Sequence, residues 1–175
     1  RDACGIGFVA HIKGQRSHGI VRDALEVLVC LDHRGARGAE PNTGDGAGIL
    51  IQIPDRFLRE EMAQQGVNLP PAGEYGVGMV FLPRPHELHR HFCESALESI
   101  VREEGLKVLG WRDVPTDNSS LGSWAQSHEP FMRQVFIARG DEIADTMSFE
   151  RKLYVIGKQA AHLIHHSEEE EGDAF

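Results

Sequence analysis

A cysteine stands at position 4, in the stretch Ala3-Cys4-Gly5, close to the start of the sequence. A thiol with an ordinary pKa of about 8.5 is a weak nucleophile at neutral pH unless a base activates it. No histidine or aspartate is marked by its neighbours as that base. If Arg1–Ala3 were removed, Cys4 would carry a free α-amine with a pKa of about 7.7–8.0, well suited to act as a general base. The sequence therefore predicts an N-terminal nucleophile that carries its own base.

A glycine-rich stretch, LDHRGARGAEPNTGDGAGIL, holds the second set of candidate residues: His33, Arg34 and Arg37. A guanidinium in such a turn can bind a carboxylate or amide ligand, or it can pin the turn by donating hydrogen bonds to carbonyl oxygens. Both roles stay open. We also expect the bare backbone of Gly5 and Gly7 to let a substrate approach closely.

Other motifs are weaker candidates. Residues 5–10 have the G-x-G-x-x-A shape of a dinucleotide site, but the strand before the glycines and the helix after them are not predicted. Histidines cluster in two predicted helices, where ligand pairs could form. No carboxylate or thiolate at a companion spacing completes a metal site, so we expect exposed or half-buried histidines. These are His86, His89, His91, His162, His165 and His166.

Composition limits the classes of protein further. The 27 acidic and 18 basic residues give a net charge of -9, which argues against nucleic-acid binding and membrane-surface binding. No apolar run is long enough to cross a membrane, and no secretory signal is apparent. Three widely spaced cysteines favour a reducing compartment, so we expect a cytoplasmic protein. Cys30 and Cys93 lie in apolar helical patterns and are predicted to be buried.

The elements that must position these residues follow from hydrophobic periodicity. The sequence predicts strands at 5–12, 47–53, 74–82, 106–114 and 133–140, and helices at 18–31, 54–65, 85–105 and 148–164. Residues 33–48 and 115–130 are expected to be irregular. Strands and helices mix in an α/β or α+β order without a repeat or a linker, so we expect a single domain over 1–175. The last helical pattern has no clear end, which suggests a piece of a longer protein.

Several stretches together resemble the N-terminal glutaminase domain, of the class II glutamine amidotransferase family, in the large subunit of glutamate synthases. They are CGIGFVAHIKG, LDHRGARGAEPNTGDGAGILIQIP, LGWRDVPTDNSSLG, MRQVFIAR and FERKLYVIGKQA. The resemblance runs from Cys4 to about His162. The HRG motif is shared with other class II amidotransferases, whereas HRGA followed by EPNTGDGAGIL points to glutamate synthases.

The resemblance implies an α+β fold of the N-terminal nucleophile hydrolase type, a four-layer αββα sandwich of which residues 1–175 would form the first part. It implies that Arg1–Ala3 is a short propeptide whose cleavage exposes Cys4. Cys4 is then expected to attack the side-chain amide of glutamine, releasing ammonia and leaving a γ-glutamyl thioester that water hydrolyses. Arg34 and Gly35 of HRG are expected beside the nucleophile, with Arg34 helping to organise it.

For the complete protein, the resemblance implies that 2-oxoglutarate is aminated and reduced to glutamate with FMN and an iron–sulfur cluster. Its partners would be the remaining synthase domains and a small reductase subunit or ferredoxin. No cofactor or metal site is expected in 1–175. The family's oxyanion-hole Asn-Gly pair and the Arg and Asp that hold glutamine are expected after residue 175, and Asn42 and Asn118 do not stand in that motif. Because oxyanion donors contribute roughly 10²–10³ in rate, 1–175 alone is expected to be nearly inactive.

Two other functions stay open. The chain could be a non-catalytic binding or assembly module that keeps the fold, in which case Arg1–Ala3 would be retained. It could also be a histidine-rich metal-binding protein, which predicts stoichiometric metal.

Overall fold

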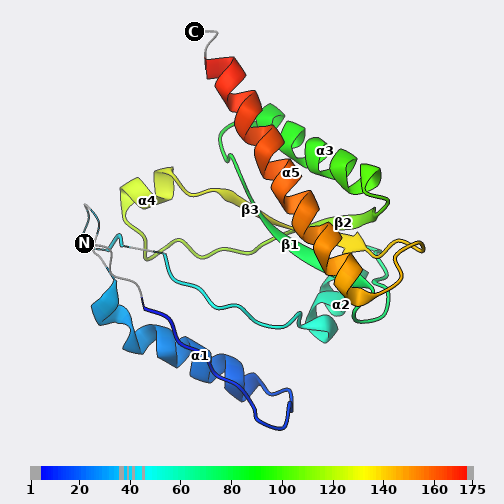
Figure 1. The fold of residues 1–175 in the computed structure, drawn as a ribbon. Coiled ribbons are helices and arrows are strands. Elements are labelled where there is room, and N and C mark those ends of the chain that lie inside the picture. The colour runs from blue at the N-terminus through cyan, green and yellow to red at the C-terminus, as the bar shows by residue number, and fades with distance from the viewer. Residues whose placement is uncertain (1–4, 36–37, 39, 41, 45, 173–175) are drawn as a thin grey trace. The chain divides into compact units, whose positions relative to one another are not determined.

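The computed structural model describes residues 5–35, 38, 40, 42–44 and 46–172. The chain divides into two compact units (Figure 1). Unit 1 comprises Arg1–Pro54 and Thr116–Glu129, and unit 2 comprises Asp55–Pro115 and Pro130–Phe175. Each unit is described by itself. The single domain over 1–175 stays a prediction.

Unit 2 is built on a three-stranded antiparallel sheet in the order β1-β3-β2. The strands are β1 (Tyr75–Leu82), β2 (Lys107–Asp113) and β3 (Phe131–Ala138). The central strand β3 is hydrogen-bonded on both sides, with Phe136 opposite Val77 of β1 and opposite Gly110 of β2. Mixed helices and an antiparallel sheet agree with the predicted α+β class.

Helices cover both faces of this sheet (Figure 1). On one face, α3 (Glu87–Glu103) and α5 (Thr146–Gly172) pack together. Their core comprises Leu97, Ile100, Val101, Leu106, Val135, Ile137, Phe149, Ile156 and Ala160. On the other face, α2 (Asp55–Gln64) covers a second core of Leu58, Met62, Leu69, Tyr75 and Phe136. Side chains alternate along a strand, so β3 supplies Val135 and Ile137 to one core and Phe136 to the other.

Unit 1 contains α1 (His18–Cys30), a short 3₁₀ helix η1 (Asp32–Arg34) and α4 (Ser123–Ser127). The Ser17 hydroxyl caps α1 by accepting a hydrogen bond from the N–H of Gly19 at 3.0 Å. Apart from these helices and a bridge residue at Gly44, the described residues of unit 1 form turns, bends and segments without regular secondary structure.

Most predicted elements are confirmed to within a few residues, including the end of α3 before Gly105, whose φ of 77° favours glycine. The helix predicted at 148–164 is longer than expected, since α5 spans Thr146–Gly172. The strands predicted at 5–12 and 47–53 are wrong. A strand needs a neighbour for its N–H and C=O groups, and neither segment has a ladder partner among the described residues. The irregular stretch 115–130 was also expected to lack a helix, yet it contains α4.

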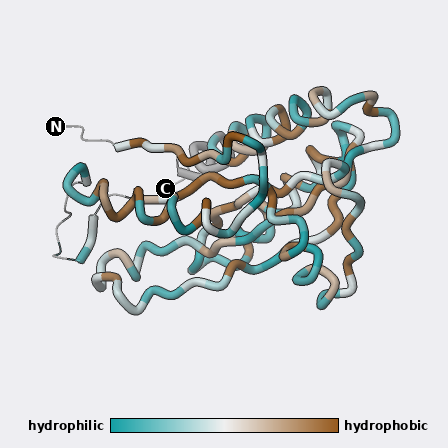
Figure 2. The backbone as a smooth tube through the Cα atoms, turned by 90° about the horizontal axis from the view of Figure 1, so that it is seen from below, coloured by the Kyte–Doolittle hydropathy of each residue, from teal (hydrophilic) through white to brown (hydrophobic). Residues whose placement is uncertain are grey.

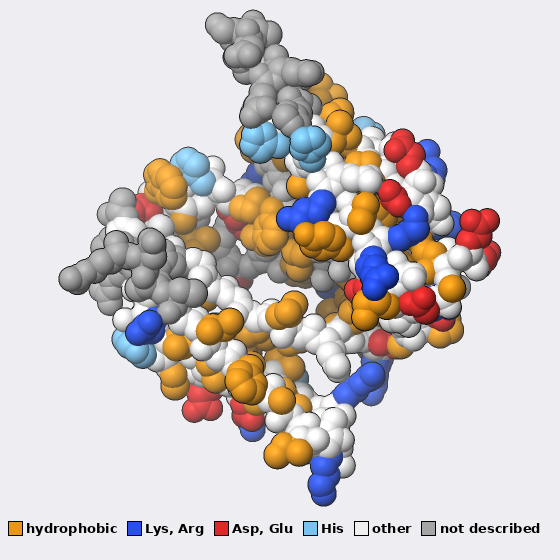
Figure 3. Space-filling view, in the orientation of Figure 1, with side chains coloured by type: hydrophobic (Ala, Val, Ile, Leu, Met, Phe, Trp, Pro, Cys, Tyr) orange, Lys and Arg blue, Asp and Glu red, His pale blue; other side chains and the backbone are white. Residues whose placement is uncertain are grey.

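The predicted burial is confirmed for Cys93 and wrong for Cys30, which is exposed. Cys30 ends α1, and no residue of α1 is buried. The sequence of α1 does carry the apolar stripe that predicted burial, but no other described part of unit 1 buries it. Hydrophobic side chains accordingly appear on the visible surface around α1 (Figure 3), where Val29 is 75% exposed.

The extended stretch after the N-terminus is also apolar and exposed. Figure 2 colours part of it as hydrophobic although it lies in no helix or strand, and Ile6 and Phe8 are each 94% exposed. Over the part of the chain that the structure describes, no helix is long and apolar enough to cross a membrane.

Candidate active site

The predicted nucleophile, Cys4, lies outside the described residues, as does Arg37. Its neighbour Gly5 is described, and it lies against the end of α1 and the residues that follow. A Cβ added to Gly5 would meet Leu31 Cδ2 at 2.9 Å and Arg34 Cβ at 3.4 Å. The structure thus brings the residue after Cys4 next to the arginine of the HRG motif.

The HRG motif forms a tight turn directly after α1. Arg34 is the last residue of η1, and its N–H donates to the Leu31 carbonyl at 2.8 Å. Gly35 follows in an extended conformation, and its N–H donates to the Asp32 carbonyl at 3.1 Å. The His33 ring Nδ1 lies 2.9 Å from the Cys30 carbonyl oxygen, a bond that holds this side chain on the helix end.

The two N-terminal glycines have a packing role. A Cβ on Gly7 would lie 2.7 Å from Val27 Cγ1, closer than side chains pack, and Val27 is β-branched and stiff. Glycine at positions 5 and 7 therefore lets the N-terminal stretch lie close along α1. The approach of a substrate to these glycines stays a prediction.

A half-buried carboxylate, that of Glu40, connects two parts of unit 1 that are distant in sequence. Its Oε2 accepts the Thr43 hydroxyl at 2.9 Å, and its Oε1 accepts the Ser123 hydroxyl at 3.0 Å. The N–H of Trp124 donates to both oxygens, at 3.3 and 3.2 Å. Gly122 faces the same carboxylate, and a Cβ there would overlap Oε2. We call these residues, Glu40, Thr43, Gly122, Ser123 and Trp124, the Glu40 clamp.

The clamp is built for an ionised carboxylate. The hydrogen bond from Thr43, together with those from Trp124 and Ser123, lowers the pKa of Glu40 below its ordinary value, although some desolvation opposes this. Donors that point at both oxygens stabilise the charged form. Glu40 therefore holds 116–129 to the glycine-rich turn as an anion at neutral pH.

Two amides reinforce the same connection. Asn42 Nδ2 donates to the Ser120 carbonyl at 3.1 Å, and Asn118 Nδ2 donates to Glu129 Oε2 at 2.9 Å. Glu129 is 9% exposed, so this pairing satisfies a nearly buried carboxylate. Asn42 and Asn118 thus hold structure together within unit 1.

Sequence reasoning missed the Glu40 clamp. Glu40 and Ser123 are 83 residues apart, and nothing in the local pattern of either residue indicates the other. The sequence held only a weak indication of α4, the helix that carries Ser123 and Trp124. Gly122 and Ser123 are residue types that are common at the start of a helix.

Unit 2 has a separate polar hollow of about 270 Å³ between α3 and the sheet. Arg133 lies in it and donates to Glu94 Oε1 at 2.6 Å and Asp113 Oδ1 at 2.7 Å. Arg90 stacks over Phe131, 4.7 Å from the ring centroid. The Arg133 charge is thus paired with two carboxylates, and neither Arg34 nor Gly35 lines the hollow.

The residues of this chain do not fit the cofactors that the resemblance implies for the complete protein. Iron–sulfur clusters are held by several cysteines, but each unit has only one cysteine among its described residues, Cys30 in unit 1 and Cys93 in unit 2. The glycine-rich run is followed by an extended stretch at 46–54, not by the helix N-terminus that binds a phosphate. Over the described ranges, no group of three or more histidine, cysteine or acidic side chains could hold a metal ion.

Comparison with known proteins gives a consistent result. The family model for class-II glutamine amidotransferases matches residues 4–174. The chain is 50% identical to the NADPH glutamate synthase large chain of Bacillus subtilis, over 91% of this chain and 10% of that protein. It is 44% identical to the NADH glutamate synthase of Schizosaccharomyces pombe, over 94% of this chain and 8% of the relative. It is 38% identical to ferredoxin-dependent glutamate synthase 2 of Synechocystis, over 92% and 10%.

The chain thus spans about a tenth of the length of these relatives. The predicted resemblance to the glutaminase part of glutamate synthases is confirmed, since the family match covers nearly the whole sequence and the relatives carry that name. This chain belongs to the class II glutamine amidotransferases.

Proposed function

We propose that Cys4 is the nucleophile of a glutaminase that forms part of a glutamate synthase. Family membership supports this function, and so does the position of Gly5. Gly5 is joined to Cys4 by one peptide bond and lies beside Arg34, the arginine that the family motif assigns to the nucleophile. This contact is the observation that carries the proposal.

The proposed chemistry begins with a cleavage. Hydrolysis of the peptide bond between Ala3 and Cys4 frees the α-amine of Cys4. This amine takes the thiol proton while sulfur attacks the side-chain amide carbon of glutamine. The C–N bond then breaks, and the nitrogen leaves as ammonia with the transferred proton. Water hydrolyses the γ-glutamyl thioester, which yields glutamate and restores the thiol.

The proposed setting extends beyond this chain. The fold would be the first part of an αββα sandwich, and the ammonia would be used to convert 2-oxoglutarate to glutamate in the remaining synthase domains. FMN and an iron–sulfur cluster would belong to those domains. The electron donor would be a reductase subunit or ferredoxin, and the protein would be cytoplasmic.

The first test is mass spectrometry and kinetics of the full-length protein. We expect the mature N-terminus to be Cys4, with the mass of Arg-Asp-Ala lost. Changing Cys4→Ala should lower glutamine hydrolysis by at least about 10³-fold, because no other group replaces the nucleophile.

Cys30→Ser is the matched control, because Cys30 is an exposed thiol in the same unit and should be dispensable. A thiol-alkylating glutamine analogue should label Cys4 in the wild type and in this control. Retention of Arg1–Ala3 in active protein, or glutaminase activity in Cys4→Ala, would refute the proposal. Retention in inactive protein would favour the non-catalytic module.

A further inference from the structure

We infer that Glu40 is a positioning residue for the glutaminase reaction, an inference that rests on the proposed function. Its carboxylate would act through the glycine-rich turn that directly follows Arg34 and Gly35, and it would not touch glutamine. The Glu40 clamp would hold this turn in the geometry that the nucleophile needs.

The first step is the connection along the chain. Arg34 and Gly35 are followed by the glycine-rich turn, whose glycines leave the backbone with little stiffness of its own. The described part of this turn is closed by two backbone bonds, Gly38 N–H to the Thr43 carbonyl at 2.6 Å and Thr43 N–H to the Glu40 carbonyl at 3.1 Å. Glu40 is thus fixed within the turn at both its backbone and its side chain.

The second step is the anchor on the other side. Ser123 and Trp124 belong to a segment that is itself held by side-chain bonds, since Gln126 Nε2 donates to the carbonyls of Asn118 and Leu121, each at 3.1 Å. Glu40 therefore joins the glycine-rich turn to a segment that is held by its own side-chain hydrogen bonds. Glu40 accepts three of the hydrogen bonds that bridge them, one from the Ser123 hydroxyl and two from the Trp124 N–H. Its loss should therefore loosen the turn most.

The third step is the shape of Gly122. Only a residue without a Cβ leaves room for the Glu40 carboxylate, because a Cβ at this position would overlap Oε2 and lie 2.8 Å from Thr43 Oγ1. The Glu40 carboxylate thus occupies the space that a side chain at position 122 would need. Changing either one should break the same clamp.

The consequence for catalysis is a change in rate without a change in substrate binding. A group held about 1 Å out of place can cost roughly 10²-fold in rate. Arg34 is proposed to organise Cys4, whereas the groups that hold glutamine are expected elsewhere. Loosening the clamp should therefore lower kcat and leave KM for glutamine nearly constant.

The test uses the full-length protein and Glu40→Gln. We expect kcat for glutamine hydrolysis to fall by about 10- to 100-fold with KM changed by less than about 2-fold. We also expect the second-order rate constant for alkylation of Cys4 by a glutamine analogue to fall in parallel, with one label per chain at completion. A loss of folded protein would lower the labelling stoichiometry, not the rate constant of the labelled fraction.

Two further variants test whether the effect comes from the clamp. Gly122→Ala should reproduce it, and the double variant should be no slower than the slower single variant, because both changes break one contact. Asp117→Asn is the matched control: it removes a carboxylate from the same segment, but Asp117 is bonded locally, to the N–H of Ser119 at 3.0 Å and to the Ser119 hydroxyl. Hydrogen exchange at the Trp124 amide should rise in Glu40→Gln and stay constant in Asp117→Asn.

The outcomes separate the two proposals. If Cys4→Ala keeps its glutaminase activity, the proposed function fails. If Cys4→Ala is inactive while Glu40→Gln alkylates at the wild-type rate, the inference on Glu40 fails alone. Additive effects of Glu40→Gln and Gly122→Ala, or an equal loss in Asp117→Asn, would also overturn it.

Discussion

The pKa of Tyr75 in unit 2 is set by its surroundings. Its ring is buried in the core under α2, stacks with Phe136, and its hydroxyl donates to Asp55 Oδ1 at 2.9 Å. Burial, and then the bond to the Asp55 carboxylate, raise the pKa of Tyr75 to about 12. An ionised phenolate would lose this bond and face a negative charge.

We predict that stability falls with pH in the range set by this shift. The folded chain holds the phenol proton more tightly than the unfolded chain, whose tyrosines ionise near pH 10. The stability from Tyr75 is therefore complete below about pH 10 and is lost as the pH rises through about 12. Urea unfolding at several pH values should show this loss, and Tyr75→Phe should remove it.

Spectroscopy can isolate the same group. The chain has 2 tyrosines, so Tyr154→Phe leaves Tyr75 as the single source of tyrosinate absorbance. We expect a midpoint near pH 12 in the folded protein and near pH 10 in urea. A midpoint near pH 10 in the folded protein would show that Tyr75 is not enclosed with Asp55.

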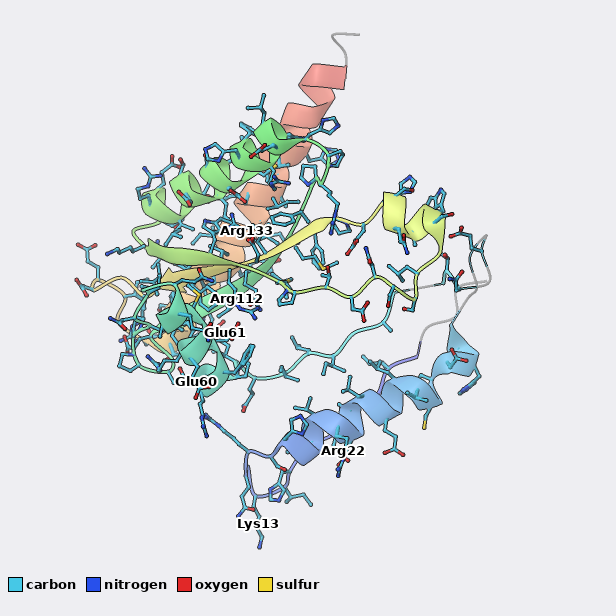
Figure 4. All side chains as sticks on the ribbon, turned by 180° about the vertical axis from the view of Figure 1, so that it is seen from behind. Lys13, Arg22, Glu60, Glu61, Arg112 and Arg133 are labelled. Carbon is cyan, nitrogen blue, oxygen red and sulfur yellow. The ribbon has the colours of Figure 1, made fainter. Side chains whose placement is uncertain are left out.

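At the scale of elements, a nearly buried arginine joins α2 to the sheet. Arg112 of β2 is 7% exposed and donates to Glu61 Oε2 through Nη2 at 2.7 Å and Nε at 3.0 Å (Figure 4). It also donates to Gln134 of β3 at 3.1 Å and lies over the Phe57 ring. One guanidinium thus links a helix with two strands.

Neighbouring glutamates on α2 give a matched test of this link. Glu61→Ala leaves the Arg112 charge nearly buried without its carboxylate and should lower the free energy of unfolding by about 3 kcal/mol. Glu60→Ala removes only the pair with Arg56, which is exposed on both sides, and should cost less than about 1 kcal/mol. The two variants are comparable because each replaces a glutamate of α2 with alanine. Equal losses in urea unfolding would contradict the role assigned to Arg112.

Sequence patterns predicted α1 and the elements of unit 2 well, but they predicted two strands in unit 1 that the structure lacks, for a physical reason. The helices and strands around the two cores bury the apolar stripes that the periodicity encodes, as in β3 and α5. The segments 5–12 and 47–53 carry strand-like patterns, but a strand also depends on a partner that its own sequence does not specify. The HRG turn was recognised by its motif, whereas the Glu40 clamp depends on a contact between distant segments.

At the scale of the whole chain, stability is unevenly distributed. All of the buried apolar side chains that the structure describes lie in unit 2, while Ile12 and Leu50 of unit 1 are fully exposed. Burial of apolar surface is the main stabilising contribution to folding. The two units are therefore expected to differ in local stability.

We predict that hydrogen exchange of residues 1–175 will show this difference directly. Amides of β3 should be the slowest, because they lie in the central strand between two cores, and amides of 5–12 should exchange at nearly unprotected rates. Val135→Ala should accelerate exchange in β3 and leave 5–12 as it was. Strong protection at 5–12 would contradict the absence of a strand there.

The central position of β3 has a consequence for how its gene can change. Odd- and even-numbered positions of this strand serve different cores, with Val135 and Ile137 on one side and Phe136 on the other. Inserting or deleting one codon within the strand would reverse this parity beyond the change and direct the side chains there to the opposite core. Point substitutions can be absorbed locally, but a change in the length of β3 would disrupt both hydrophobic layers at once.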